Sequence, residues 1–96
     1  MTHWADNVIE KLQAGEQVTF RPRGHSMTPH IMSGQEVTLS PDISSLKKRD
    51  IVLARVKGRI YLHFIDAIGD DGRYMIVNAR GNPNGWTRRV YGVRIK

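Results

Sequence analysis

Apolar residues recur at helical spacing only in the first part of the chain. The early turns of this stretch carry acidic residues and its end carries a lysine, which suits the dipole of a helix. Gly15 follows as a typical C-terminal stop. We therefore predict an amphipathic helix over residues 3–14. One face would collect four apolar side chains: Trp4, Val8, Ile9 and Leu12.

Beyond Gly15 the pattern changes to short apolar runs separated by glycine, proline and asparagine. We predict a short helix after the turn at 24–29, a hairpin turn at Gly58, a second turn at 69–72 and a loop over 80–85. The pattern indicates a mainly β fold: an N-terminal helix over 1–15, then one compact, antiparallel, barrel-like domain over 16–96. The predicted strands cover 18–20, 36–39, 51–56, 60–68, 73–78 and 89–95.

The composition narrows the class of protein. The chain has 96 residues, of which 40% are hydrophobic and 25% charged, as in an ordinary single globular domain. It has no cysteine, and its histidines and carboxylates form no recognised metal motif, so we expect no disulfide, metal or cofactor. Neither a membrane-spanning run nor a signal peptide is apparent, so we expect a soluble, cytoplasmic protein.

Positive charge concentrates toward the C-terminus. The net charge is +6, and residues 73–96 hold six basic groups and no acidic one. This asymmetry is either a solvated basic face or a surface for nucleic acid or another polyanion. Trp86 could stack on a base beside these arginines, or cover the open end of a small barrel. The candidate polyanion-binding residues are Arg80, Arg88, Arg89 and Arg94.

A serine after a glycine turn is the main chemical signal in the sequence. In Gly24-His25-Ser26-Met27-Thr28-Pro29, such a turn would expose the hydroxyl of Ser26 beside backbone N–H groups. A nucleophile with an oxyanion hole needs this geometry, and the hole would involve Gly24, Ser26 and Met27. The same serine could instead cap a short helix. A serine nucleophile also needs a general base. Three histidines are candidates for this base: His25, His30 and His63.

Five segments in order resemble the conserved boxes of the LexA-type and signal-peptidase superfamily of serine peptidases. They are residues 26–31, 34–37, 50–54, 61–65 and 84–92. The resemblance implies that Ser26 is the nucleophile and that His63 stands where most members have a lysine base. Histidine occurs there in signal peptidases of the endoplasmic-reticulum type. A peptide or protein substrate would then bind as an extended strand, with a small residue at the cleaved position.

Other positions depart from the family pattern. His25 stands where an acidic residue usually precedes the serine, and Thr87 stands where signal peptidases carry an aspartate that could orient the histidine. Two hypotheses therefore remain. The first is a minimal soluble serine peptidase with a Ser26–His63 dyad. The alternative is an inactive peptidase-like domain that binds protein or nucleic acid as a regulatory module, as would suit a phage or mobile element.

Overall fold

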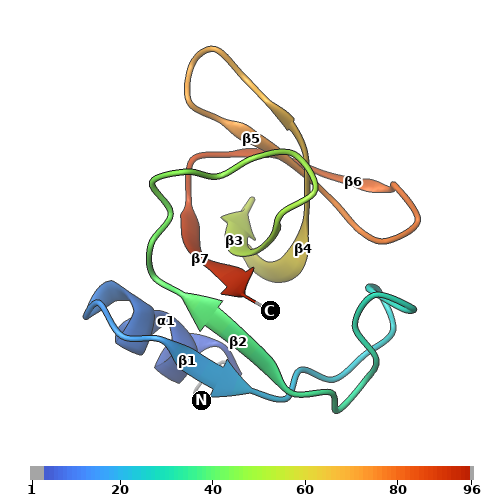
Figure 1. Ribbon diagram of the computed structural model, residues 1–96. Helices are drawn as coiled ribbons and strands as arrows, with labels where there is room; N and C mark the ends of the chain where they lie inside the picture. The colour runs from blue at the N-terminus through green and yellow to red at the C-terminus, as the bar shows by residue number, and fades with distance from the viewer. Residues whose placement is uncertain (1–3, 96) are drawn as a thin grey trace.

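The computed structural model of the protein describes residues 4–95. One helix precedes seven strands that form a single antiparallel sheet (Figure 1). The order of strands in the sheet is β1-β2-β7-β3-β4-β5-β6, and each neighbouring pair is antiparallel. The elements are α1 (Asp6–Gln13), β1 (Val18–Phe20), β2 (Val37–Ser40), β3 (Ile51–Val56), β4 (Arg59–Ile68), β5 (Tyr74–Val77), β6 (Pro83–Thr87) and β7 (Val90–Ile95).

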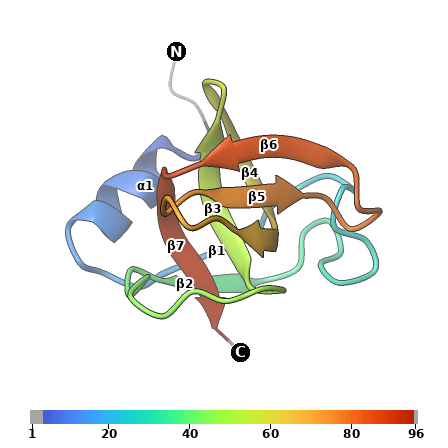
Figure 2. The same ribbon diagram turned by 90° about the horizontal axis from the view of Figure 1, so that it is seen from above.

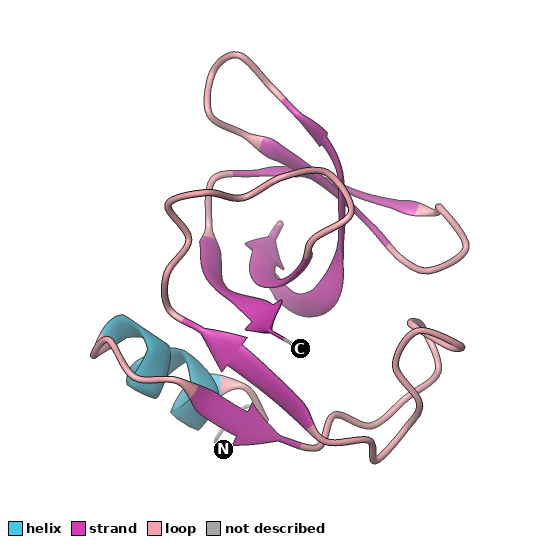
Figure 3. Cartoon of the chain, in the orientation of Figure 1, coloured by secondary structure: helices cyan, strands magenta, loops and turns pink. Residues whose placement is uncertain are grey.

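The mainly β class with one short leading helix is confirmed, but the sheet is not closed into a barrel. Figures 2 and 3 show a strongly curved sheet with α1 against one side of it. The edge strands β1 and β6 do not pair with each other. The curvature brings Thr87 of β6 close to β3, where its hydroxyl donates a hydrogen bond to the Arg55 carbonyl at 2.6 Å.

Two predicted elements are wrong. No helix follows the turn at 24–29, where the chain forms turns with one isolated helical hydrogen bond, from Ile31 N–H to the Met27 carbonyl. The N–H groups that would continue a helix bond elsewhere: that of Met32 donates to the side-chain oxygen of Gln35 at 2.9 Å, and that of Gly34 to the Pro22 carbonyl at 2.8 Å. Residues 83–85, predicted within the loop over 80–85, instead form β6 together with the unassigned residues 86–87, because pairing with β5 overrides their poor strand propensity.

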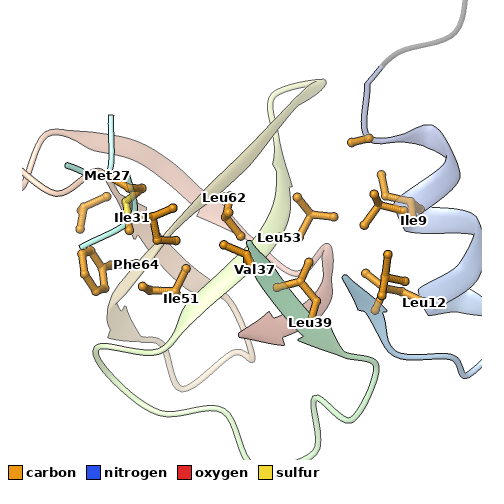
Figure 4. Close-up of a cluster of buried hydrophobic side chains, with 14 residues drawn as sticks. Ile9, Leu12, Met27, Ile31, Val37, Leu39, Ile51, Leu53, Leu62 and Phe64 are labelled. Carbon is orange, nitrogen blue, oxygen red and sulfur yellow. The ribbon is translucent and has the colours of Figure 1, made fainter. Parts of the chain in front are cut away.

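The core lies on both faces of β3, the strand at the centre of the sheet. Leu53 and Ile51 pack with α1, β2 and β4 on one face, while Val52, Ala54 and Val56 pack on the other. This explains why β3 reads as a continuous apolar run rather than an alternation. On the first face, Ile9 and Leu12 of α1 lie at one end of the cluster (Figure 4).

Candidate active site

Ser26 lies in the long connection between β1 and β2, and its side chain is exposed. The turn before it depends on Gly24, whose φ of 117° is a conformation that residues with a Cβ rarely adopt. The N–H of Gly24 donates a hydrogen bond to the Ser33 hydroxyl at 3.1 Å, which ties the two arms of this connection together. The sequence therefore presents the Ser26 hydroxyl on a constrained turn.

Two apolar residues after the serine hold this turn against the sheet. Met27 and Ile31 are buried in the first core cluster, and Figure 4 shows them beside Phe64 and Ile51. On the other side, the N–H of Ala79 donates a hydrogen bond to the Ser26 carbonyl at 3.0 Å. The serine backbone is thus held by the core and by the loop between β5 and β6.

His63 is the candidate base that the fold brings to Ser26. It lies on β4, opposite Val52 of β3, and is only 5% exposed. Its Nε2 lies 3.0 Å from Ser26 Oγ, within hydrogen-bonding distance, although the two residues are 37 apart in sequence. The ring of Tyr61, two residues earlier on β4, stacks on the imidazole with 5.0 Å between ring centroids. Of the other two candidates, His30 packs edge-on against Phe64, and His25 is exposed.

Asn84 is a third member of the site, and the sequence analysis missed it. Its Oδ1 lies 2.7 Å from Nδ1 of His63. With this oxygen as acceptor, the imidazole carries its proton on Nδ1 and presents the lone pair of Nε2 to the serine hydroxyl. Three asparagines occur within seven residues, namely Asn78, Asn82 and Asn84. The sequence shows this cluster of asparagines, but it does not indicate which of them contacts His63.

The environment of His63 favours its neutral form. Burial lowers the pKa of His63 below its usual 6.5, and the hydrogen bond with Asn84 opposes that shift in part. A neutral imidazole can accept a proton from serine, whereas an imidazolium cannot. The arrangement therefore has the three groups that nucleophilic catalysis by serine requires: a hydroxyl, a neutral imidazole within hydrogen-bonding distance of it, and a partner for the other ring nitrogen.

The position that lacks the expected aspartate has a structural role instead. Thr87 is buried, and its hydroxyl donates to the Arg55 carbonyl and accepts from the Arg89 N–H at 3.0 Å. It is therefore not available to His63. The side-chain amide of Asn84, near the start of β6, lies beside the imidazole instead.

The expected oxyanion loop is assembled only in part. The N–H of Gly24 is already engaged with Ser33. The N–H groups of Ser26 and Met27 have no hydrogen-bond acceptor within residues 4–95. Of the three residues considered for this loop, Ser26 and Met27 are therefore the ones whose amides have no partner in the described part of the chain.

A cleft of about 310 Å³ opens beside Ser26 and His63. Most of the side chains that line it are apolar, and they come from α1's leading segment, the serine turn and β4. They include Trp4, Met27, Ile31, Met32, Ile60 and Leu62. The cleft is large enough to hold side chains of a bound peptide rather than solvent alone.

The basic residues predicted to bind polyanions do not form one surface. Arg88 and Arg89 line a second depression at the end of β6, together with Arg55, Lys57 and Arg73. Arg80 lies in the turn after β5 and Arg94 lies on β7, and neither lines that depression.

Within the described residues, no group of three histidine or acidic side chains is placed to hold a metal ion. No helix in that part of the chain has the length and apolar character needed to cross a membrane.

Comparisons with known proteins return no match at a significant level: no family model, no curated protein and no solved structure.

Proposed function

We propose that the protein is a serine peptidase in which Ser26 is the nucleophile, His63 the general base and Asn84 the residue that orients the base. The observation that carries this proposal is the continuous chain of hydrogen bonds, 3.0 Å from Ser26 Oγ to His63 Nε2 and 2.7 Å from His63 Nδ1 to Asn84 Oδ1. Under this proposal the curved sheet corresponds to the barrel-like catalytic core of the LexA and signal-peptidase superfamily, with histidine in place of lysine.

The roles of the three groups follow from ordinary acyl-transfer chemistry. Ser26 Oγ attacks the carbonyl carbon of the peptide bond while His63 Nε2 takes the hydroxyl proton. The imidazolium then gives that proton to the leaving amine, and water hydrolyses the ester by the same path in reverse. Asn84 holds the ring in the required tautomer. Because an amide is neutral, it stabilises the imidazolium less than a carboxylate would.

The negative oxygen of the tetrahedral intermediate requires hydrogen-bond donors. The N–H groups of Ser26 and Met27 are free within the described part of the chain and follow the exposed turn. A donor of this kind contributes about 2.7–4 kcal/mol to the transition state of a serine peptidase. We assign the oxyanion hole to one or both of these amides.

The first part of β4 has no partner strand on the side of β5, which favours a substrate that binds there as an extended strand. The N–H of Ile65 donates to the Asp50 carbonyl, on the β3 side, so alternation turns the backbone groups of Leu62 and Ile60 toward the opposite edge. There β5 pairs with β4 only from Phe64 onward. The free stretch borders the cleft, and a peptide can add to it as a strand. The apolar lining favours substrates with apolar or small side chains near the cleaved bond.

A direct test is labelling by a fluorophosphonate probe, which reacts with a serine activated by a base and needs no known substrate. We expect one adduct, located at Ser26 by peptide mass spectrometry, and its loss in Ser26→Ala and His63→Ala. Ser45→Ala and His25→Ala are matched controls, because both residues are exposed and lie outside the site. Circular dichroism would verify that each variant is folded.

The same samples should cleave members of a quenched-fluorescence peptide library rich in small and apolar residues. Cleavage that survives Ser26→Ala would exclude Ser26 as the nucleophile. If the folded protein shows neither labelling nor cleavage, the peptidase proposal fails and the alternative of an inactive binding module gains support.

A further inference from the structure

In a second depression, apart from the serine site, five of the eight lining residues are cationic. Its volume is about 460 Å³, and it lies between the β3–β4 hairpin and the end of β6. Its cationic side chains are Arg55, Lys57, Arg73, Arg88 and Arg89, and the remaining lining residues are Gly58, Trp86 and Thr87. We propose that this depression, the basic pocket, is a binding site for single-stranded nucleic acid.

Three of the guanidinium groups are held in place by the fold. Arg55 donates to the Tyr91 hydroxyl at 2.9 Å, and Arg73 pairs with Asp71 at 2.7 Å. Arg88 donates to the backbone carbonyl of Asp71 at 3.0 Å. Donors ordered in advance lose less conformational entropy when they bind a phosphate, so this arrangement favours an anionic ligand.

The negative charge beside the basic pocket does not cancel the cations. Asp71 is the carboxylate that contacts them, through Arg73 and, at 4.0 Å, Arg88, and its neighbour in the turn is Asp70. Lys57 and Arg89 are exposed and form no ion pair within residues 4–95. The pocket therefore keeps a clear excess of positive charge.

Trp86 decides which anion fits best. Trp86 is 43% exposed, lies close to the turn at Gly69 and lines the same depression as the five cations. An aromatic face beside cations that contact phosphates is the arrangement that binds unpaired bases. A duplex keeps its bases stacked inside and could not use the indole in this way. An anionic membrane is less well matched, because Trp86 is the only large apolar side chain that lines the pocket in the described structure.

The test is the fluorescence anisotropy of a labelled 15-nucleotide oligothymidine, titrated with protein from 50 to 300 mM salt. We expect Kd to rise steeply with salt. Lys57→Gln combined with Arg89→Gln should weaken binding at least tenfold at low salt. It should also reduce the slope of log K against log salt by about 1.4, since each phosphate contact to a single strand contributes about 0.7. Trp86→Leu should weaken binding about tenfold and leave the slope unchanged.

The matched control is Arg80→Gln combined with Arg94→Gln, which removes the same charge from the basic C-terminal segment outside the pocket. This pair should change Kd by less than about twofold and leave the slope unchanged. Equal weakening by both pairs would show diffuse attraction to net charge and overturn the site.

Two further outcomes also overturn the proposal. In the first, the protein binds a 15-base-pair duplex as tightly as it binds the single strand, and Trp86→Leu does not change either Kd. The other is binding to vesicles of phosphatidylcholine and phosphatidylserine without binding to the oligonucleotide. Melting temperatures within a few degrees of the wild-type value would show that each variant is folded. None of these measurements depends on Ser26.

Discussion

His63 and Asn84 meet side chain to side chain although their strands are not neighbours in the sheet. Strand β5 lies between β4 and β6, yet Nδ1 of His63 is 2.7 Å from Oδ1 of Asn84. The contact is possible because β5 is short: it ends at Val77, and its pairing with β4 begins only at Phe64. His63 lies one residue beyond the last β4–β5 pair, Phe64 with Val77, and Asn84 lies at the irregularity of β6 between the partners of Val77 and Ile76.

This contact predicts a kinetic role for Asn84. Asn84→Ala should lower kcat by about 10- to 100-fold with little change in KM, because the ring loses the partner that fixes its tautomer. Asn84→Asp should keep the geometry and raise the pKa of His63, which moves the acidic limb of the pH–rate profile to higher pH. Asn82→Ala is the control, since that exposed side chain lies outside the chain of hydrogen bonds. Unchanged kcat in Asn84→Ala would remove Asn84 from the mechanism.

The burial of His63 predicts the pH dependence of the reaction. Its pKa is lowered, so the neutral base persists below pH 6.5, and kcat/KM should fall only when the pH drops below that value. Tyr61→Ala removes the ring stacked on the imidazole and should return the pKa toward 6.5. The NMR titration of the His63 ring protons measures the pKa independently of activity. A free-protein pKa above 6.5 in the wild type would contradict this prediction.

Thr87 should matter for stability rather than for catalysis. Thr87→Val buries the Arg55 carbonyl and the Arg89 N–H without their hydroxyl partner, which should cost about 1–3 kcal/mol of unfolding free energy. Urea denaturation gives the value. Thr19→Val is the comparison, because the hydroxyl of Thr19 bonds only to Thr38 on an exposed face, and its cost should stay near 0.5 kcal/mol or less.

The docking of α1 on the sheet depends on the absence of a side chain at Gly92. A Cβ there would lie 2.9 Å from a methyl group of Leu12 and 3.0 Å from the Ser40 carbonyl oxygen. Gly92→Ala should therefore destabilise the fold by about 1–3 kcal/mol, measured by thermal or urea unfolding. Adding Leu12→Ala should relieve only part of the strain, because the contact with Ser40 remains. A stable Gly92→Ala protein would mean that α1 shifts freely on β7.

The pattern of apolar residues was enough to predict most of the regular structure. The strands at Val18–Phe20 and Ile51–Val56 have the predicted bounds, and the hairpin turn at Gly58 is confirmed. The helix is shorter than expected, Asp6–Gln13 rather than 3–14, and residue 3 lies outside the described part of the chain. These elements could be predicted because each depends on the pattern of apolar residues within its own short segment.

The sequence by itself determined the mainly β class, the leading helix and, through ordered motifs, Ser26 and His63 as candidates. Only the tertiary structure decided that Asn84 hydrogen-bonds to His63, that Thr87 does not, and that two of the four predicted polyanion-binding arginines line a pocket with Trp86. The physical reason is sequence separation. The site contacts join residues 21 and 37 positions apart, and the strand that carries Asn84 forms only because β5 pairs with it. No local pattern encodes such contacts, because they depend on the curvature of the whole sheet.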